Sequence, residues 1–460
     1  MGTAQVEAVV VGAGIAGLAA ALELQSAGCD VLVADPSDRP GGVMRTDHRK
    51  GFVVESGPST ALVRAPMLDF LSRRGLHDGL LRASPASRRR FLYRGGRMIR
   101  VPDSVWRIAR TPLLSRRAKL RALTEPFRRR GRSDGETVAE FVGRRLGKEV
   151  SSALVGPFLT GVYAGDEEQL GAAAVFPRWV DREQRFGSLA AGGFAGLFRR
   201  DRERGLRGSY ATEQGFGPFA RRLAEGLTEP PALGTRVAWI ARDGARWHVD
   251  LTSPSGDLSL SAARVVMAAP AYAAADVLRG LDGDLAAALE GIAYAPIVVA
   301  PVGIEAGRTR EPIEGFGFLV PREESLGLLG CLFMSQLFPG RAPAGHELLH
   351  CMLGGVRWPE AVHLPDAALQ ARLAEDLSRT LGIADPPAAL GFVRWPRAVP
   401  QPGRDHRARI RWLSERLDDT PGLALAGSYV AGVSVSDSLA SGVAAAARAL
   451  AAVPFVRSTI

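Results

Sequence analysis

The sequence VVVGAGIAGL, residues 9–18, sets three β-branched apolar residues directly before a Gly-x-Gly-x-x-Gly pattern. A run of helix formers, Leu18 to Leu24, follows the third glycine. A buried strand, a tight glycine turn and a helix in this order are typical of a dinucleotide-binding unit, because the turn lets backbone approach a pyrophosphate at the helix N-terminus. We therefore predict a Rossmann-type α/β domain that begins here, with Gly12, Gly14 and Gly17 in its turn.

Further strands of this domain are predicted from apolar runs. Residues 31–34 (VLVA) predict the second strand, and Asp35 follows at its end, where a carboxylate can accept hydrogen bonds from a ribose. Four later runs also predict strands: residues 235–240, 246–251, 264–269 and 423–426. Residues 432–437 then open a helix that we expect to run to about Val453.

The predicted Rossmann-type domain is discontinuous, because its strands are separated by long stretches of other character. We predict that residues 1–80, 208–271 and 405–460 form it. Residues 81–207 are predicted to be a mainly helical insertion, and residues 272–404 an inserted α+β domain that binds the substrate. The fold class is thus α/β with two insertions.

Composition limits the class of protein. The chain has 460 residues, 46% hydrophobic and 23% charged, which suits a globular protein of two or three domains. Its three cysteines show no CxxC spacing, which disfavours a disulfide scaffold and a metal site and suits a reducing, cytoplasmic compartment. No apolar run reaches about 18 residues, and the first one leads straight into the glycine turn, so we predict neither a spanning helix nor a secretory signal.

Positive charge is concentrated in one stretch. Between Arg88 and Arg132 there are 16 basic and 2 acidic residues, whereas the formal net charge of the whole chain is +10. Three interpretations remain open: a solvated face, a nucleic-acid patch and a surface for anionic lipid. Leu113, Leu114, Leu120, Leu123 and Phe127 lie among these basic residues, a mixture that suits an interfacial helix.

Two glycine-rich segments resemble the amine-oxidase-type flavoproteins. Residues 38–46 (DRPGGVMRT) resemble the RxGG segment of that family, and residues 51–58 (GFVVESGP) its next turn. Residues 427–437 (GSYVAGVSVSD) resemble the final segment, where a helix N-terminus points at the flavin. The resemblance implies FAD, which we expect to be non-covalent because no cysteine lies near the last segment. It assigns the following residues to FAD: Gly12, Ala13, Gly14, Ile15, Ala16, Gly17, Asp35, Pro36, Arg39, Gly41, Gly42, Val43, Met44, Arg45, Gly57, Pro58, Ser59, Val237, Ala269, Gly427, Gly432, Val433, Ser434, Val435 and Asp437.

The inserted regions are similar to those of the oxygen-dependent protoporphyrinogen oxidases. The matching segments are residues 90–96 (RFLYRGG), 161–170 (GVYAGDEEQL), 315–321 (GFGFLVP) and 395–401 (WPRAVPQ). This resemblance implies FAD-dependent oxidation of protoporphyrinogen IX to protoporphyrin IX, with O2 as acceptor and H2O2 as product. It places Phe316, Leu319 and Met352 at the walls of the substrate pocket, Arg90 at a propionate and Gly165 beside the ring.

Other functions stay open at this point. Coproporphyrinogen III oxidation is the nearest alternative, followed by amine oxidases and carotenoid desaturases. A nucleic-acid-binding protein with a vestigial Rossmann domain would rest on the basic stretch alone, which contains no nucleic-acid-binding motif. We predict peripheral contact with the inner face of an anionic cell membrane, a weak homodimer and no nucleic acid. Three positions depart from the family pattern: Pro402 (usually tyrosine), Asp405 (usually glycine) and Ser436 (usually asparagine).

Overall fold

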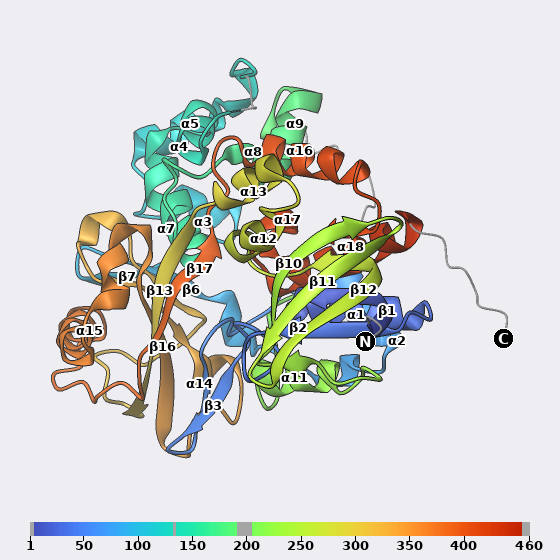
Figure 1. Ribbon diagram of the computed structural model, residues 1–460. Coiled ribbons are helices and arrows are strands. Elements are labelled where there is room, and N and C mark those ends of the chain that lie inside the picture. Colours follow the sequence, from blue (N-terminus) through green and yellow to red (C-terminus); the bar gives the residue numbers. More distant parts are fainter. Residues whose placement is uncertain (1–3, 132–134, 191–204, 453–460) are drawn as a thin grey trace.

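The computed structural model describes residues 4–131, 135–190 and 205–452. Figure 1 shows two large sheets side by side, with a group of short helices beyond one end of them. Both sheets have seven strands. None of the helices in the described ranges is long and apolar enough to cross a membrane.

The first sheet has the parallel core that the glycine turn predicted. Its strands are β1 (Ala4–Val11), β2 (Val31–Asp35), β9 (Ala232–Leu233), β10 (Arg236–Asp243), β11 (Arg246–Ser253), β12 (Gly256–Met267) and β18 (Leu423–Leu425). Strand β1 pairs in parallel with β2 and β12, and β18 pairs in parallel with the end of β12. The antiparallel hairpin β10–β11 continues the sheet beyond the first half of β12. The predicted α/β Rossmann-type class is confirmed.

Both faces of this sheet are covered, which explains the continuous apolar run of β1. Ala8 and Val10 join one hydrophobic cluster, whereas Val9 and Val11 join another on the opposite face. Helices α1 (Ile15–Ser26) and α18 (Val435–Ala452) pack together on the first face. A Cβ on Gly442 would lie 2.0 Å from the carbonyl oxygen of Ala16, so these helices touch backbone to backbone.

The second sheet draws strands from both insertions. Its strands, in spatial order, are β17 (Val393–Pro400), β13 (Tyr294–Glu305), β16 (His346–Gly354), β15 (Leu328–Phe333), β14 (Gly317–Leu319), β6 (Arg90–Arg94) and β7 (Arg97–Arg100). Strand β6 pairs in parallel with β14, so a hairpin from the first predicted insertion completes the sheet of the second.

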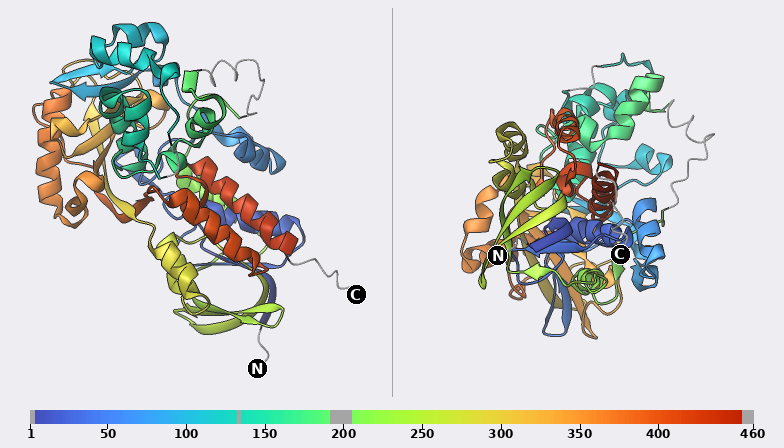
Figure 2. Two further views of the ribbon diagram at one scale, coloured as in Figure 1. Left: turned by 90° about the horizontal axis from the view of Figure 1, so that it is seen from above. Right: turned by 45° about the vertical axis from the view of Figure 1, so that its right-hand side comes forward.

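The two faces of the second sheet have different neighbours. Leu349, Cys351 and Leu353 of β16 pack in the cluster that contains the apolar side of α15 (Asp366–Leu381). Figure 2 shows α15 on the outer side of this sheet, away from α18. The alternate residue Leu348 belongs to the cluster of the Rossmann-type domain, so this side of β16 faces that domain.

Short helices form the third part of the structure. They are α3 (Val105–Arg110), α4 (Arg116–Leu123), α5 (Val138–Arg145), α6 (Lys148–Val150), α7 (Gly156–Tyr163), α8 (Ala172–Val175) and α9 (Pro177–Phe186). The prediction that Leu113 and Leu114 line an interfacial helix was wrong, because both side chains are buried and Leu114 packs in the core of these helices. Helix α4 is also only 8 residues long. Arg132 lies outside the described residues.

The remaining elements connect these parts. They are β3 (Thr46–Arg49), β4 (Phe52–Glu55), α2 (Ala65–Arg73), β5 (Leu80–Arg82), β8 (Tyr210–Thr212), α11 (Phe216–Ala224), α12 (Ala271–Leu278), α13 (Gly283–Glu290), α14 (Met334–Leu337), α16 (His406–Asp418) and α17 (Ser428–Ala431). Short 3-10 helices are η1 (His77–Gly79), η2 (Pro85–Arg88), η3 (Glu125–Phe127), η5 (Arg322–Glu324), η6 (Gly355–Arg357) and η7 (Pro359–His363), and η4 (Ser151–Val155) is a short π-helix.

Candidate active site

The three glycines of the first turn have different surroundings. A Cβ on Gly17 would lie 1.8 Å from the carbonyl oxygen of Gly12, so only glycine allows this packing of helix on turn. Gly12 has φ +108°, and a Cβ there would lie 3.0 Å from the carbonyl oxygen of Ala268. A Cβ on Gly14 would meet nothing within 4 Å. The backbone at Gly14 therefore borders open space at the N-terminus of α1, which fits a pyrophosphate.

Asp35 is fixed beside this turn. Its Oδ2 accepts a hydrogen bond from Ala13 N at 2.7 Å, and its Oδ1 accepts one from Ser37 N at 2.8 Å. Each carboxylate oxygen has a second lone pair with which it can accept a ribose hydroxyl. Thr235 N donates to the carbonyl oxygen of Asp35 at 2.9 Å, which brings the start of β10, and with it Val237, to the same end of β2.

A second glycine loop lies directly against the first turn. Gly41 N donates to Ala13 O at 2.7 Å, and a Cβ on Gly42 would lie 3.4 Å from the Cα of Gly14. The guanidinium of Arg39 donates to Gly42 O at 2.9 Å and to Met44 O at 3.1 Å. Arg39 therefore holds the shape of this loop, and its predicted contact with the pyrophosphate stays a prediction.

The loop of residues 56–59 packs on the Arg39–Arg45 loop. A Cβ on Gly57 would lie 2.0 Å from Val43 O, and Ser56 N donates to Arg45 O at 2.8 Å. The neighbouring Glu55 is buried, and this burial raises its pKa to about 7 although Thr46 and Arg341 favour its charged form. The two loops predicted to lie along FAD are thus in backbone contact.

The C-terminal segment completes the expected cofactor site. Ser434 accepts a hydrogen bond from Asp437 N at 3.0 Å and donates to Asp437 Oδ2 at 2.6 Å, which caps the N-terminus of α18. Arg64 forms an ion pair with the other oxygen of Asp437. A Cβ on Gly427 would lie 4.0 Å from Ala269 O, so this segment and the end of β12 lie close together.

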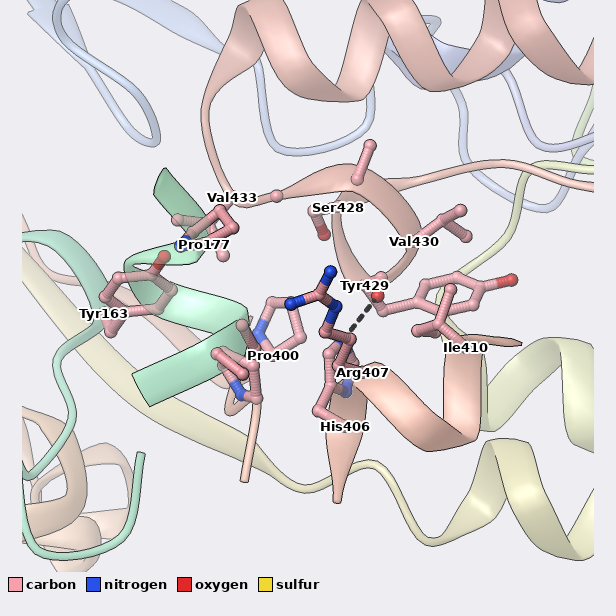
Figure 3. Close-up of a pocket in the computed structure, with 15 residues that line it drawn as sticks. Tyr163, Pro177, Pro400, His406, Arg407, Ile410, Ser428, Tyr429, Val430 and Val433 are labelled. Carbon is pink, nitrogen blue, oxygen red and sulfur yellow. Dashed lines mark hydrogen bonds between the residues drawn. The ribbon is translucent and has the colours of Figure 1, made fainter. Parts of the chain in front are cut away.

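A cavity of 220 Å³ lies beside this segment, shown in Figure 3. It is lined by Tyr163, Ala173, Ala174, Pro177, Pro400, Pro402, His406, Arg407, Ile410 and residues 428–433. His406 Nε2 donates a hydrogen bond of 2.9 Å to Tyr429 O, which joins α16 to the C-terminal segment. Pro402, which departs from the family pattern, lies in the wall of this cavity.

Leu319 and Met352 share one face of the second sheet. Leu319 pairs with Gly330, and Gly330 pairs with Met352, so the two side chains flank a position that has none. Met352 lies two residues after His350 and four after Leu348, on the face toward the Rossmann-type domain. A Cβ on Gly161 would lie 2.5 Å from Leu319 Cδ2, so α7 closes this apolar surface on one side.

Arg90 lies at the edge of the same face. It pairs with Gly317 across β6 and β14, and its guanidinium carbon lies 4.7 Å from the ring centre of Phe316. Arg90 is an exposed residue, although its neighbours desolvate the guanidinium enough to lower its pKa, and none of the described carboxylates forms an ion pair with it. Its neighbour Arg89, by contrast, pairs with Glu314. Arg90 is thus a cation stacked on an aromatic ring, with unused donors for an anion.

Gly165 lies in a loop that is held on two sides. A Cβ on Gly165 would lie 2.5 Å from Gln401 Oε1, and Gln401 donates to Tyr163 O at 2.8 Å. Val356 N donates to Ala164 O at 2.9 Å. The structure therefore joins the Gly165 loop to the β17 end and to the turn after β16.

Comparison with known proteins identifies the family. Residues 15–450 match the model of the flavin containing amine oxidoreductases. The chain belongs to this family. As a flavin-containing oxidoreductase it binds FAD, and the open space beside the Gly14 backbone fits the pyrophosphate of this cofactor.

The names of individual similar proteins are more specific than the family description. The chain is 31% identical over 456 residues to the chloroplastic protoporphyrinogen oxidase of Nicotiana tabacum, covering 94% of this chain and 83% of that protein. It is 27% identical to the coproporphyrinogen III oxidase of Bacillus subtilis (strain 168), covering 96% and 97%. A solved structure from Exiguobacterium sp. 255-15, provisionally described as a protoporphyrinogen oxidase, has a TM-score of 0.80 and 26% identity, covering 97% and 98%.

Sequence reasoning missed three side chains of this flavoenzyme that hold the predicted FAD segments. Trp395 Nε1 donates to Ser56 O at 2.7 Å, His350 lies beside Ser59, and Arg64 pairs with Asp437. The strand alternation around Met352 could have indicated His350, which lies two residues before it. No sequence signal pointed to Arg64.

Proposed function

We propose that this chain oxidises a porphyrinogen to the aromatic porphyrin, with FAD as hydride acceptor, O2 as final acceptor and H2O2 as product. The observation that carries the proposal is an apolar surface, formed by Leu319 and Met352, with Arg90 at its edge, whose guanidinium pairs with none of the carboxylates in the described ranges. A porphyrinogen is largely apolar and carries propionates at its edge, so it needs walls and a cation of this kind.

Each residue has a distinct task in this proposal. Leu319 and Met352 would pack against the macrocycle, and the backbone of Gly165 would approach its ring. Arg90 would bind a propionate through two parallel N–H···O bonds, and Phe316 would keep the guanidinium in place. FAD, when bound, supplies the hydride acceptor, and these side chains orient the substrate toward it and exclude water.

Protoporphyrinogen IX is the substrate we favour, and coproporphyrinogen III is the alternative. The purified protein would be given each porphyrinogen in air, with porphyrin fluorescence and H2O2 recorded together. Formation of porphyrin with H2O2 supports the proposal, and the ratio of the two kcat/KM values selects the substrate. A flavin-loaded protein that oxidises neither compound would overturn it.

We also propose that FAD is bound without a covalent bond. Cys331 and Cys351 are buried on the side of the second sheet that faces α15, and Cys29 is buried after α1. The flavin should therefore leave the polypeptide on acid precipitation. Colour retained in the washed, redissolved protein would contradict this expectation.

We further propose peripheral attachment to the cytoplasmic face of an anionic membrane. Trp106, Leu120, Leu123 and Phe127, from α3 to η3, are 65–88% exposed and lie among arginines. Exposed apolar side chains beside cations suit an anionic lipid surface.

The control for this proposal is an exposed leucine of the other domain, Leu258 of β12, which is 51% exposed. Leu123→Asp should weaken co-sedimentation with phosphatidylglycerol vesicles, whereas Leu258→Asp should leave it unchanged. If the unaltered protein ignores such vesicles at low salt, the basic stretch is only a solvated face. The weak homodimer remains a prediction, to be measured by sedimentation velocity.

A further inference from the structure

The second sheet holds the loop of residues 56–59 at two points. Trp395 of β17 donates from Nε1 to Ser56 O at 2.7 Å. His350 of β16 lies at the other end of the loop, with Nε2 3.2 Å and Nδ1 3.4 Å from Ser59 Oγ. Between them, Gly57 touches the carbonyl of Val43. The loop is therefore fixed between the Arg39–Arg45 loop and the second sheet.

His350 is a buried side chain that contacts one polar group, the hydroxyl of Ser59, among the described residues. Its side chain is only 3% exposed. It pairs across the sheet with Leu332 and Pro301, which carry no charge. A neutral imidazole has one donor and one acceptor nitrogen, so it can either accept a hydrogen bond from the Ser59 hydroxyl or donate one to it.

His350 lies on β16 close to the proposed substrate wall. His350 and Met352 point to the same face, and Met352 is the predicted wall for the macrocycle. Ser59 belongs to the loop predicted to lie beside the flavin. Strand β16 thus carries both Met352, the proposed substrate wall, and, two residues earlier, His350, which contacts the cofactor loop at Ser59.

We propose that His350 is a positioning residue that sets, through Ser59, the place of the flavin ring relative to the Met352 wall. The inference rests on the proposed function only for the substrate that Met352 contacts. Hydride transfer depends steeply on the distance between the reacting atoms, and a displacement of about 1 Å can lower the rate about 100-fold. A loop released from His350 would lose this alignment while the adenine end of FAD stays held at Asp35.

The test compares four single variants, and the double variant of His350→Leu and Ser59→Ala, with the wild-type holoenzyme. His350→Leu removes the hydrogen bond, His350→Gln keeps an amide group that can donate to or accept from Ser59, and Ser59→Ala removes the partner hydroxyl. His363→Leu is the matched control, because His363 is exposed at the end of η7. The readouts are the visible circular dichroism of bound flavin, the rate of anaerobic flavin reduction by porphyrinogen, and KM.

We expect His350→Leu to keep FAD at full stoichiometry, to change the flavin dichroism and to reduce flavin about 10- to 100-fold more slowly with little change in KM. His350→Gln should recover most of the rate, and Ser59→Ala should show the same dichroism as His350→Leu. The double variant should be no worse than either single one, because both remove one contact.

Wild-type dichroism and reduction rate in both His350→Leu and Ser59→Ala would overturn the inference. If His350→Leu fails to fold, Ser59→Ala decides the question, since it leaves the imidazole in the core. The dichroism needs no porphyrinogen. A wild-type protein that oxidises no porphyrinogen would therefore overturn the proposed function and leave the effect of His350 on the flavin measurable.

Discussion

Gly14 and Gly17 offer a direct test of how the first turn holds FAD. Both belong to the same motif, yet a Cβ on Gly14 meets nothing within 4 Å and a Cβ on Gly17 would lie 1.8 Å from Gly12 O. Gly14 also has φ −70° and ψ 174°, which any residue adopts. The protein itself therefore tolerates a side chain at position 14 and rejects one at position 17.

The expected magnitudes follow from this geometry. In Gly14→Val, the side chain fills the space that the pyrophosphate needs, and overpacking of this kind costs about 1–3 kcal/mol. The affinity for FAD should fall about 5- to 150-fold, since each 1.4 kcal/mol is a factor of about ten. The helix start should lose only about 1 kcal/mol, because valine is a poorer N-cap than glycine. In Gly17→Ala, by contrast, α1 must move away from its turn, and the fold itself should weaken.

The assay separates folding from binding by using flavin-free protein. Thermal unfolding of the apoproteins would be followed by far-ultraviolet circular dichroism, and FAD would be titrated by the quenching of its fluorescence. Gly14→Val should unfold close to the wild-type temperature and bind FAD weakly, whereas Gly17→Ala should unfold early or remain insoluble. Wild-type affinity in Gly14→Val would refute the placement of the pyrophosphate at this glycine. Equal destabilisation in both variants would refute the distinction between them.

Three further predictions concern ionisable side chains. Arg90→Ala should raise KM for porphyrinogen about 10- to 100-fold, the loss of a charge-assisted pair, with the flavin spectrum unchanged; equal effects in Arg88→Ala would make Arg90 an ordinary surface charge. Burial raises the pKa of Glu55 to about 7, so its contribution to stability is full below pH 4.5 and is lost, by up to about 3 kcal/mol, as the pH rises through 7. The free energy of unfolding of Glu55→Gln, measured with urea at pH 5 and at pH 8, should not show that loss. Burial lowers the pKa of His350 to about 4. The contribution of His350 to the free energy of unfolding is therefore full above pH 6.5 and is lost, by up to about 3 kcal/mol, as the pH falls through 4. The stability gap between the wild type and His350→Leu should therefore narrow on acidification, and a gap that widens would contradict the buried neutral imidazole.

Local patterns in the sequence predicted most strands of the first sheet, but not β9 or the first half of β12. The apolar run before Gly12 is β1, residues 31–34 lie in β2, and the run near position 423 is β18. These strands are short, buried on both faces and bounded by turn residues, so their signals do not depend on distant contacts. The α/β class followed from them and is confirmed.

Which strands form the second sheet could not be predicted in the same way. Strands β6 and β7 are separated from β14 by more than 200 residues of sequence, and their pairing depends on register between Arg90 and Gly317. Leu113 and Leu114 show the same limit, because the burial of both side chains, and the packing of Leu114 among the short helices, follow from tertiary structure and not from local composition. A mixture of leucine and arginine indicates an amphipathic segment but does not say which leucines face the core.

The arrangement of the loops explains why one site can draw on such distant parts of the chain. In a parallel sheet the carboxyl ends of neighbouring strands meet at one edge, so the residues after β1, β2, β12 and β18 come together without any special contact between them. The second sheet is then tied to that edge by side chains, namely Trp395 and His350 on the loop of residues 56–59. We therefore expect the topology alone to set the place of the cofactor's phosphates, and we expect the relation between the flavin and the proposed substrate wall to depend on these few hydrogen bonds. Substitutions at those bonds should therefore change the reaction before they change the fold.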